Sequence, residues 1–369
     1  MRGQEIEAPL IDRLVRELRP DVSVGNVTVT GIKSYGDADN ESSVSTSSQV
    51  RMEVGYDGQG GHNQLPRQLL AKLSFPDDIE CNNPELNVWF ENEVFFYNRV
   101  RPELDIETPI GMGGHFDWDS NRFILLMGDL GTQHPHINTM MDPPAVEPVR
   151  AVLMELAKLH ARFWQSPRFD TDLAWVQNQV DGTLEGLFDG SVRLHIHREL
   201  ARNPFKREFI EELGTTEAEL YAMMKAIKRH QARLPQTLLH GDAHFGNSYL
   251  LPDGRGGLLD WQAFARGNFM HDVGYMIQTG LSVDHRRKHE RDLLDEYREA
   301  LLQHGAGPDV PDRETVWLEY RRSMIYGFHM GWITAPYENY GWECMVLGNH
   351  RTKAACMDHD SVRLGQQVL

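Results

Sequence analysis

The stretch HGDAHFGN, residues 240–247, holds the side chains best suited to chemistry, and it lies between the apolar runs TLL and SYLL. Its spacing is His240-x-Asp242-x-x-x-x-Asn247, and a further carboxylate, Asp260, follows the apolar stretch GGLL. A carboxylate can hold an attacking hydroxyl, while an amide oxygen and a second carboxylate suit magnesium, which prefers oxygen ligands. The glycines permit the tight turn that would fix these groups. The pattern predicts a magnesium (Mg²⁺) site beside a carboxylate that orients a hydroxyl.

Two charged residues upstream are candidates for a site that grips phosphate. Lys72 is the single lysine in the strand-like run RQLLAKLSF, and Glu93 lies in the helix-like stretch FENEVFFY. Glu93 is one helical turn from Phe96 and Tyr97, so we expect it to be half-buried and to pair with Lys72. Two simpler interpretations stay open. Lys72 can be a strand residue whose amine reaches solvent, and Glu93 can be a surface charge, with Glu91 as an alternative partner.

These motifs together resemble a known family. LLHGDAHFGNSYLL, LLDWQ and HDVGYMI look like the aminoglycoside phosphotransferase and choline kinase group of the protein-kinase-like superfamily. WFENEVFFYNRVRPEL and LLDWQ are especially similar to its ecdysteroid-kinase-like branch, and the resemblance covers about residues 25–335. It implies an α+β, bilobal protein-kinase-like fold, with an antiparallel sheet and a helix in the N-terminal lobe and a mostly helical C-terminal lobe. It also implies transfer of the γ-phosphoryl group of ATP or GTP, with Mg²⁺, to a hydroxyl of a small molecule.

The resemblance assigns roles within the C-terminal lobe. Asp242 would be the catalytic base, and Asn247 and Asp260 would bind Mg²⁺. Asp272, in HDVGYMI, would brace the catalytic loop, and His240 would be structural.

The resemblance also assigns the nucleotide contacts. Lys72 would grip the α- and β-phosphates and Glu93 would position it. The hinge against the adenine would be Met127, Gly128, Asp129 and Leu130. The family often has an acidic residue where Gly128 stands, so this chain's preference between ATP and GTP is open. SYGDADNESS lacks a G-x-G-x-x-G pattern, and Ser42 and Ser43 are expected to cover the phosphates instead.

A metal-dependent hydrolase is an alternative from another class. His240, Asp242 and His244 would then bind zinc, which needs further ligands elsewhere. Those ligands would come from His134, His136, His271 or Asp272. This hypothesis leaves the predicted lysine–glutamate pair unexplained.

A non-catalytic, kinase-like binding protein is the second alternative. The complete set Lys72, Asp242, Asn247 and Asp260 argues against it, because a scaffold that only binds need not keep all four. Asp242 and Asn247 are also common turn residues, but the later aspartate makes a turn alone an insufficient explanation.

The composition limits the partners. Of 369 residues, 40% are hydrophobic and 25% charged, which is ordinary for a globular protein. The net charge of −17, from 54 acidic and 37 basic residues, argues against nucleic-acid binding and is compatible with a cationic or neutral acceptor. Three cysteines suggest no disulfide framework and fit a cytoplasmic location. We expect neither a signal peptide nor a membrane span, and nothing in the sequence indicates an oligomeric state.

The order of elements predicts two lobes, residues 1–130 and 131–369. Strands are expected at 27–32, 48–56, around Lys72, at 109–112 and at 122–130, with helices at 7–19 and before Pro102. Helices then predominate, at 145–165, 182–199, 203–212, 215–233, 284–304 and 312–334. A short β island, 237–262, carries the catalytic motif. Aromatic residues that could face an acceptor are Trp332, Tyr337, Tyr340 and Trp342.

Overall fold

The computed structural model describes residues 6–33, 47–57, 65–74, 87–142 and 145–369, apart from the side chains of Tyr337 and Asn339. The chain divides into two compact units, Met1–Pro135 and His136–Leu369. The sequence expectation placed this division after residue 130. Ser42 and Ser43, expected to cover the phosphates, lie outside the described residues.

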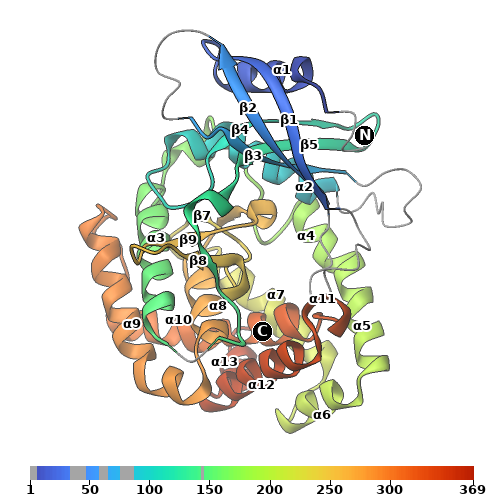
Figure 1. The fold of residues 1–369 in the computed structure, drawn as a ribbon. Helices are drawn as coiled ribbons and strands as arrows, with labels where there is room; N and C mark the ends of the chain where they lie inside the picture. The colour runs from blue at the N-terminus through green and yellow to red at the C-terminus, as the bar shows by residue number, and fades with distance from the viewer. Residues whose placement is uncertain (1–5, 34–46, 58–64, 75–86, 143–144) are drawn as a thin grey trace. The chain divides into compact units, whose positions relative to one another are not determined.

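The described part of the first unit contains one five-stranded antiparallel sheet (Figure 1). Its order is β1-β2-β3-β5-β4, and the strands are β1 (Ser23–Lys33), β2 (Ser48–Asp57), β3 (Gln68–Leu73), β4 (Gly111–Asp117) and β5 (Arg122–Gly128). Side chains alternate between the two faces of a strand. The core therefore takes every second residue of β2 and β3: Val50, Met52, Val54, Leu69, Ala71 and Leu73.

Two helices pack on this sheet. The α1 helix (Ala8–Leu18) lies against β1 and β4 and buries Ile11, Leu14 and Val15. The α2 helix (Asn87–Phe95) packs against β4 and β5, and it continues through a π-helical turn, Phe96–Val100, and a 3-10 turn, Arg101–Glu103. The predicted end near Pro102 is confirmed, since proline cannot continue the helical hydrogen bonds.

The second unit is mostly helical, so the predicted α+β, kinase-like fold class is confirmed. Its helices are α3 (Glu147–Arg162), α4 (Thr183–Leu187), α5 (Arg193–Arg202), α6 (Pro204–Glu212), α7 (Glu217–Gln231), α8 (Met270–Gly280), α9 (Val283–Gln303), α10 (Arg313–Tyr326), α11 (Tyr337–Tyr340), α12 (Trp342–Asp358) and α13 (Ser361–Gln366). The β island consists of β7 (Thr237–Leu239), β8 (Ser248–Leu250), β9 (Gly256–Leu258) and β10 (Ala265–Gly267), with β6 (His136–Ile137) beside β8. Both β8 and β9 lie along α3 (Figure 1).

The α8 helix was not predicted from the sequence. All of its residues, Met270–Gly280, are buried. Its polar residues, among them His271, Asp272 and Gln278, form hydrogen bonds inside the protein.

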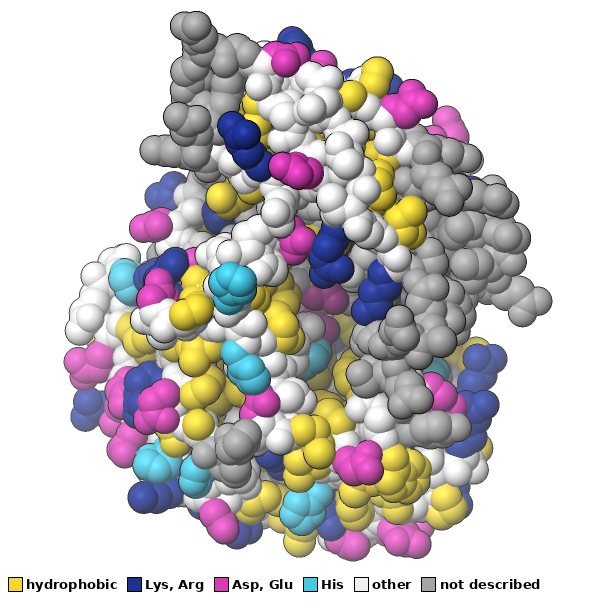
Figure 2. All heavy atoms as spheres, in the orientation of Figure 1, with side chains coloured by type: hydrophobic (Ala, Val, Ile, Leu, Met, Phe, Trp, Pro, Cys, Tyr) yellow, Lys and Arg dark blue, Asp and Glu magenta, His cyan; other side chains and the backbone are white. Residues whose placement is uncertain are grey.

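Charged side chains of both signs are interspersed over the face drawn in Figure 2. The acidic side chains on that face do not form a single patch, although the chain has an excess of them. Among the described helices, none is both long enough and apolar enough to cross a membrane.

Two glycines with similar backbone angles allow a test of how the catalytic loop is held. Gly241 has φ +84°, and a β-carbon there would lie 1.9 Å from the carbonyl oxygen of Ala263. Gly254 has φ +89°, but a β-carbon there would meet nothing within 4 Å. We expect Gly254→Ala to cost about 1–2 kcal/mol of unfolding free energy, the strain of a left-handed residue. Gly241→Ala should cost roughly 3 kcal/mol or more, because backbone must also move.

Urea denaturation of both variants measures this difference. Equal losses of stability would show that the contact between Gly241 and Ala263 does not hold the loop.

Candidate active site

The catalytic motif lies at one end of a β-hairpin. Residues 240–247 connect β7 to β8, and Ser248 of β8 pairs with Leu258 of β9. The Leu259 N–H donates to the Asn247 carbonyl at 2.8 Å, which extends the ladder by one step. Asn247 and Asp260 therefore leave the same end of the hairpin, because antiparallel neighbours lie opposite each other.

Asn247 is oriented by the carboxylate beside it. Its Nδ2 donates to the Asp242 carbonyl at 3.0 Å and to Asp242 Oδ2 at 3.1 Å. With Nδ2 so engaged, the amide oxygen Oδ1 is the atom left for a cation. Together with the Asp260 carboxylate it makes an oxygen-only donor pair, which fits Mg²⁺.

Asp260 adopts an unusual backbone conformation, φ 63° and ψ 70°. This left-handed region is uncommon for a residue with a side chain, and strain of this kind clusters at functional sites. Asp260 begins the 3-10 turn Trp261–Ala263, whose Trp261 ring is buried 4.6 Å from the His240 ring. The turn therefore sets the direction in which this carboxylate leaves the hairpin.

The two carboxylates repel each other in the metal-free chain. Burial, followed by the charge of Asp260, raises the pKa of Asp242 to about 8, against the hydrogen bond from Asn247. A cation between the carboxylates would relieve this repulsion. The electrostatics thus agree with the donor set in favouring a bound cation.

Asp272 anchors the backbone of the catalytic loop, residues 240–247, by hydrogen bonds. It accepts from the backbone N–H groups of His240 at 2.6 Å and Gly241 at 3.0 Å, and from His160 Nε2 at 3.2 Å. Burial works to raise the pKa of Asp272, but the hydrogen bond and charge of His160 outweigh it, and the pKa is lowered. Asp272 is therefore a buried anion that fixes the loop backbone.

The three histidines around the loop are neutral and structural in their contacts. His240 Nε2 donates to the Leu259 carbonyl at 2.7 Å, and its Nδ1 accepts from the Asp242 N–H at 3.3 Å. His271 Nε2 donates to the Gly241 carbonyl at 2.9 Å, and His244 Nδ1 accepts from the Gly246 N–H at 3.1 Å. Burial lowers the pKa of His244 and of His271 to about 4.

These contacts bear on the zinc hypothesis. Both ring nitrogens of His240 are already used, and His136 pairs with Asp142 at 2.8 Å. Among the described residues, no group of three or more His, Cys, Asp or Glu side chains is arranged to hold a metal ion. The geometry of these histidines therefore gives the hydrolase hypothesis no support.

Lys72 and Glu93 form an ion pair in the first unit. Lys72 Nζ on β3 lies 2.7 Å from Glu93 Oε1 on α2, and the Glu93 side chain is only 3% exposed. The alternative partner, Glu91, instead accepts from Trp118 Nε1 at 2.6 Å. The pair is thus a buried feature rather than two surface charges.

Two backbone N–H groups of the expected hinge already donate hydrogen bonds within the protein. The Gly128 N–H donates to the Ile110 carbonyl at 2.9 Å, and the Asp129 N–H donates to the Gln68 carbonyl at 2.9 Å. The Asp129 carboxylate accepts from the Gly131 N–H and pairs with Arg51 at 3.1 Å. Of the other two predicted hinge residues, Met127 is buried in β5 between β3 and β4, and Leu130 begins the 3-10 turn Leu130–Gln133.

Sequence reasoning missed three residues near the loop. His160 comes from α3, 112 positions before Asp272, and nothing local signals it. The Tyr275 ring lies 5.9 Å from His244, and the Tyr326 ring lies 4.2 Å from His271. Tyr275 could have been found, because it follows Asp272 by three residues on one helical face.

The predicted aromatic residues divide into two groups. Trp332 is 3% exposed and packs in a core cluster with Tyr275 and Met345. Tyr340 and Trp342 are 39% and 51% exposed, and their rings contact Trp332 and Phe205 respectively. The exposed pair is therefore available to an acceptor, and Trp332 is not.

A comparison of sequences gives one family. The profile of the ecdysteroid kinase-like family matches residues 43–306, which is more than half of the chain. No curated protein matches the sequence.

Solved structures are similar in fold at low sequence identity. Choline kinase from Cryptosporidium parvum Iowa II is 11% identical, with a TM-score of 0.49 over 97% of this chain and 95% of that one. The GDP and kanamycin complex of APH(2")-IIia is 12% identical, with a TM-score of 0.48 over 92% and 97%. Spectinomycin phosphotransferase, APH(9)-Ia, in complex with ADP and spectinomycin, is 10% identical, with a TM-score of 0.42 over 99% of each chain.

The neutral histidines predict acid sensitivity. A group whose pKa is lower in the folded state binds fewer protons there than in the unfolded chain, so stability falls as the pH drops through that window. For His271 the window runs from the unfolded value of 6.5 down to about 4. This corresponds to about 3 kcal/mol at most.

His271→Gln should keep a donor to Gly241 and remove the proton. Its free energy of unfolding, measured by urea denaturation from pH 7 to pH 4, should therefore fall less steeply than that of the wild type. Parallel curves for the two proteins would contradict a neutral, buried His271.

Proposed function

Because the chain belongs to the ecdysteroid kinase-like family, we propose that it transfers the γ-phosphoryl group of ATP or GTP to a hydroxyl of a small molecule. The observation that carries the proposal is the convergence of Asp242, Asn247 and Asp260 at one end of the β8–β9 hairpin. These are the residue types that phosphoryl transfer needs, in the order that kinases use.

Asp242 acts on the acceptor. Its Oδ2 is engaged by Asn247, so the acceptor hydroxyl donates to Oδ1. As the bond from the hydroxyl oxygen to the γ-phosphorus forms, the bond from that phosphorus to the β–γ bridging oxygen breaks. The hydroxyl proton passes to Asp242, and the products are a phosphate ester and the nucleoside diphosphate. The raised pKa of Asp242 in the metal-free chain suits a group that must take up a proton.

Charged side chains and a metal ion hold the nucleotide phosphates. Lys72, positioned by Glu93, binds the α- and β-phosphates as a point charge. Asn247 Oδ1 and Asp260 hold Mg²⁺, whose charge offsets that of the phosphates. The predicted hinge, residues 127–130, would contact the base.

The acceptor is a cationic or neutral hydroxylated molecule. The net charge of −17 favours such a molecule over an acid. Tyr340 and Trp342 offer aromatic faces to a flat or cationic body. The free thiols of Cys344 and Cys356 fit a cytoplasmic enzyme.

The first test is Asp242→Asn. Transfer should fall by about 10²–10⁴, the usual contribution of a general base, while nucleotide affinity stays within a few-fold. Transfer of labelled γ-phosphate would be measured with choline, kanamycin, a neutral sterol and a sugar acid as acceptors. Asp253→Asn, in the exposed β8–β9 turn, is the matched control and should behave as wild type.

Two outcomes would count against the assignment. Near-normal transfer by Asp242→Asn would remove this residue from the mechanism. A wild-type protein that binds nucleotide but transfers nothing to any acceptor would favour the non-catalytic alternative.

The second test concerns the buried ion pair. Lys72→Ala and Glu93→Ala should each weaken nucleotide binding or slow transfer, because both remove the same phosphate grip. The double variant should be no worse than the stronger single one, with a coupling energy of about 1–3 kcal/mol. Calorimetric nucleotide titration measures this, with Lys288→Ala on the exposed face of α9 as control. Full activity of Lys72→Ala would reduce the pair to a structural feature.

The third test separates magnesium from zinc. Purified protein should carry no stoichiometric zinc, lose activity in EDTA and recover it with Mg²⁺, since the donors are oxygens. Asp260→Ala should be inactive, whereas His244→Ala should retain activity. Zinc that survives dialysis, together with hydrolysis that needs no nucleotide, would support the hydrolase instead.

A further inference from the structure

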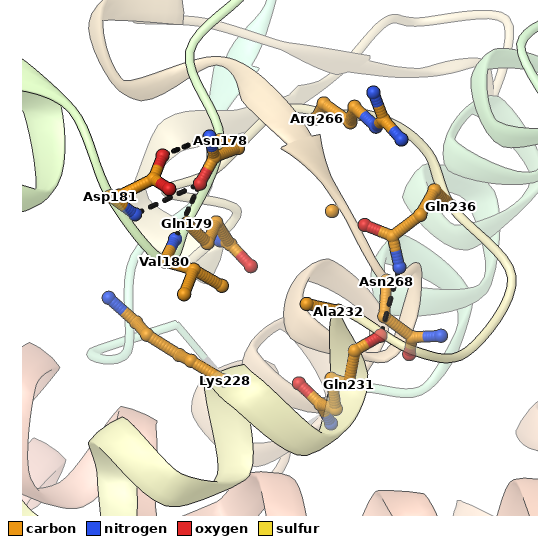
Figure 3. Close-up of a pocket in the computed structure, with 11 residues that line it drawn as sticks. Asn178, Gln179, Val180, Asp181, Lys228, Gln231, Ala232, Gln236, Arg266 and Asn268 are labelled. Atoms are coloured by element: carbon orange, nitrogen blue, oxygen red, sulfur yellow. Dashed lines mark hydrogen bonds between the residues drawn. The ribbon is translucent and has the colours of Figure 1, made fainter.

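A polar cavity of about 340 Å³ lies in the second unit, outside the site described above (Figure 3). Its walls are the turn at residues 178–181, the end of α7 and the strand β10. None of Asp242, Asn247 and Asp260 lines it. The volume lies within the range of small-molecule pockets, which begins at about 300 Å³.

Primary amides dominate the wall. Figure 3 shows Gln179 and Gln236 on opposite sides of the cavity, with their amide oxygens turned toward its centre. Gln236 uses its Nε2 on the carbonyls of Gln231 and Leu234, so its oxygen is the free end.

Because Gly267 is a glycine and has no side chain, the middle of the cavity stays open. A β-carbon there would lie 2.8 Å from Gln179 Oε1. The side chains of Val180 and Ala232 add small apolar surfaces to the wall. A ligand can therefore approach the β10 backbone closely between the two amides.

Two of the three charged side chains on the wall lie near opposite charges. Lys228 Nζ pairs with Glu185 at 2.7 Å, and Arg266 lies 3.8 Å from Asp170. The third, Asp181, accepts from Asn178 Nδ2 at 2.5 Å, and its carboxylate would repel an anionic ligand. Amides donate and accept, and so does a hydroxyl. The wall therefore suits a neutral molecule that carries several hydroxyl groups.

The cavity does not reach the catalytic carboxylate. Arg266 pairs with Leu238 in β7, and Asp242 follows four residues later, about 13 Å along an extended chain. Asn178, Gln179 and Lys228 also line a second cavity, next to Gly241 and His271, of only about 10 Å³. That space holds about one water molecule, so a ligand body cannot pass through it to Asp242.

We propose that this cavity is a second small-molecule site, for a neutral polyhydroxylated ligand of about monosaccharide size. It is separate from the acceptor and nucleotide sites, and it requires neither for binding. The recognition elements are the amides of Gln179 and Gln236.

Calorimetric titration of the nucleotide-free protein tests the proposal. The neutral probes are glucose, myo-inositol and mannitol, and glucuronate is a negatively charged counterpart of similar size. At least one neutral probe should bind with saturation at one site, and glucuronate should bind at least about tenfold more weakly. Gln179→Ala should weaken binding about five- to tenfold, the loss of one hydrogen-bonding group. Ala232→Phe should fill the cavity and abolish binding.

The controls separate this site from the active site. Gln303→Ala and Ala218→Phe make the same changes at exposed helical positions and should leave binding intact. Asp242→Asn should also bind normally, whether or not the chain proves to be a kinase. The proposal is overturned if no neutral probe binds, if glucuronate binds equally tightly, if Ala232→Phe still binds, or if Asp242→Asn abolishes binding.

Discussion

One buried carboxylate, Asp272, determines where the catalytic loop lies. It accepts two backbone N–H groups, those of His240 and Gly241, and a third hydrogen bond from His160. A carboxylate that accepts several hydrogen bonds tolerates burial, because each bond replaces one that water supplied. Through these bonds the α3 and α8 helices hold a loop that begins with a glycine at positive φ. The placement of Asp242 and Asn247 follows from that anchor.

Near the catalytic loop, burial raises the pKa of the acid Asp242 and lowers the pKa of the histidines. It keeps His244 and His271 neutral, so they serve as hydrogen-bonding groups and not as cations. The carboxylates of Asp242 and Asp260 therefore receive no compensation from these histidines, and the pKa of Asp242 rises. A divalent cation beside these carboxylates would favour the charged form of Asp242.

Burial also affects the ion pair between Lys72 and Glu93 in the first unit. Lys72 and Glu93 are nearly buried at 2.7 Å, a geometry in which desolvation offsets much of the Coulomb attraction. Such a pair adds little to stability, but it fixes the direction of the lysine amine. The cavity beside β10 differs again, because the amide oxygens of Gln179 and Gln236 face its centre. These amides mark it as a binding surface.

The sequence by itself determined the residue types, their spacing and most elements, because glycine turns and apolar periodicity are local properties. Its resemblance to the kinase-like group indicated Lys72 and Glu93 as partners, and the structure brings their charged groups to 2.7 Å. Only the tertiary structure brought His160 and Tyr326 to the loop, because contacts between residues so far apart leave no local pattern. Only the tertiary structure shows that the N–H groups of Gly128 and Asp129 donate to the carbonyls of Ile110 and Gln68. It also shows that residues 270–280 form the α8 helix. The hydrogen bonds of the polar side chains in α8 join distant parts of the chain, and a backbone hydrogen bond between distant segments likewise depends on the fold rather than on side-chain type.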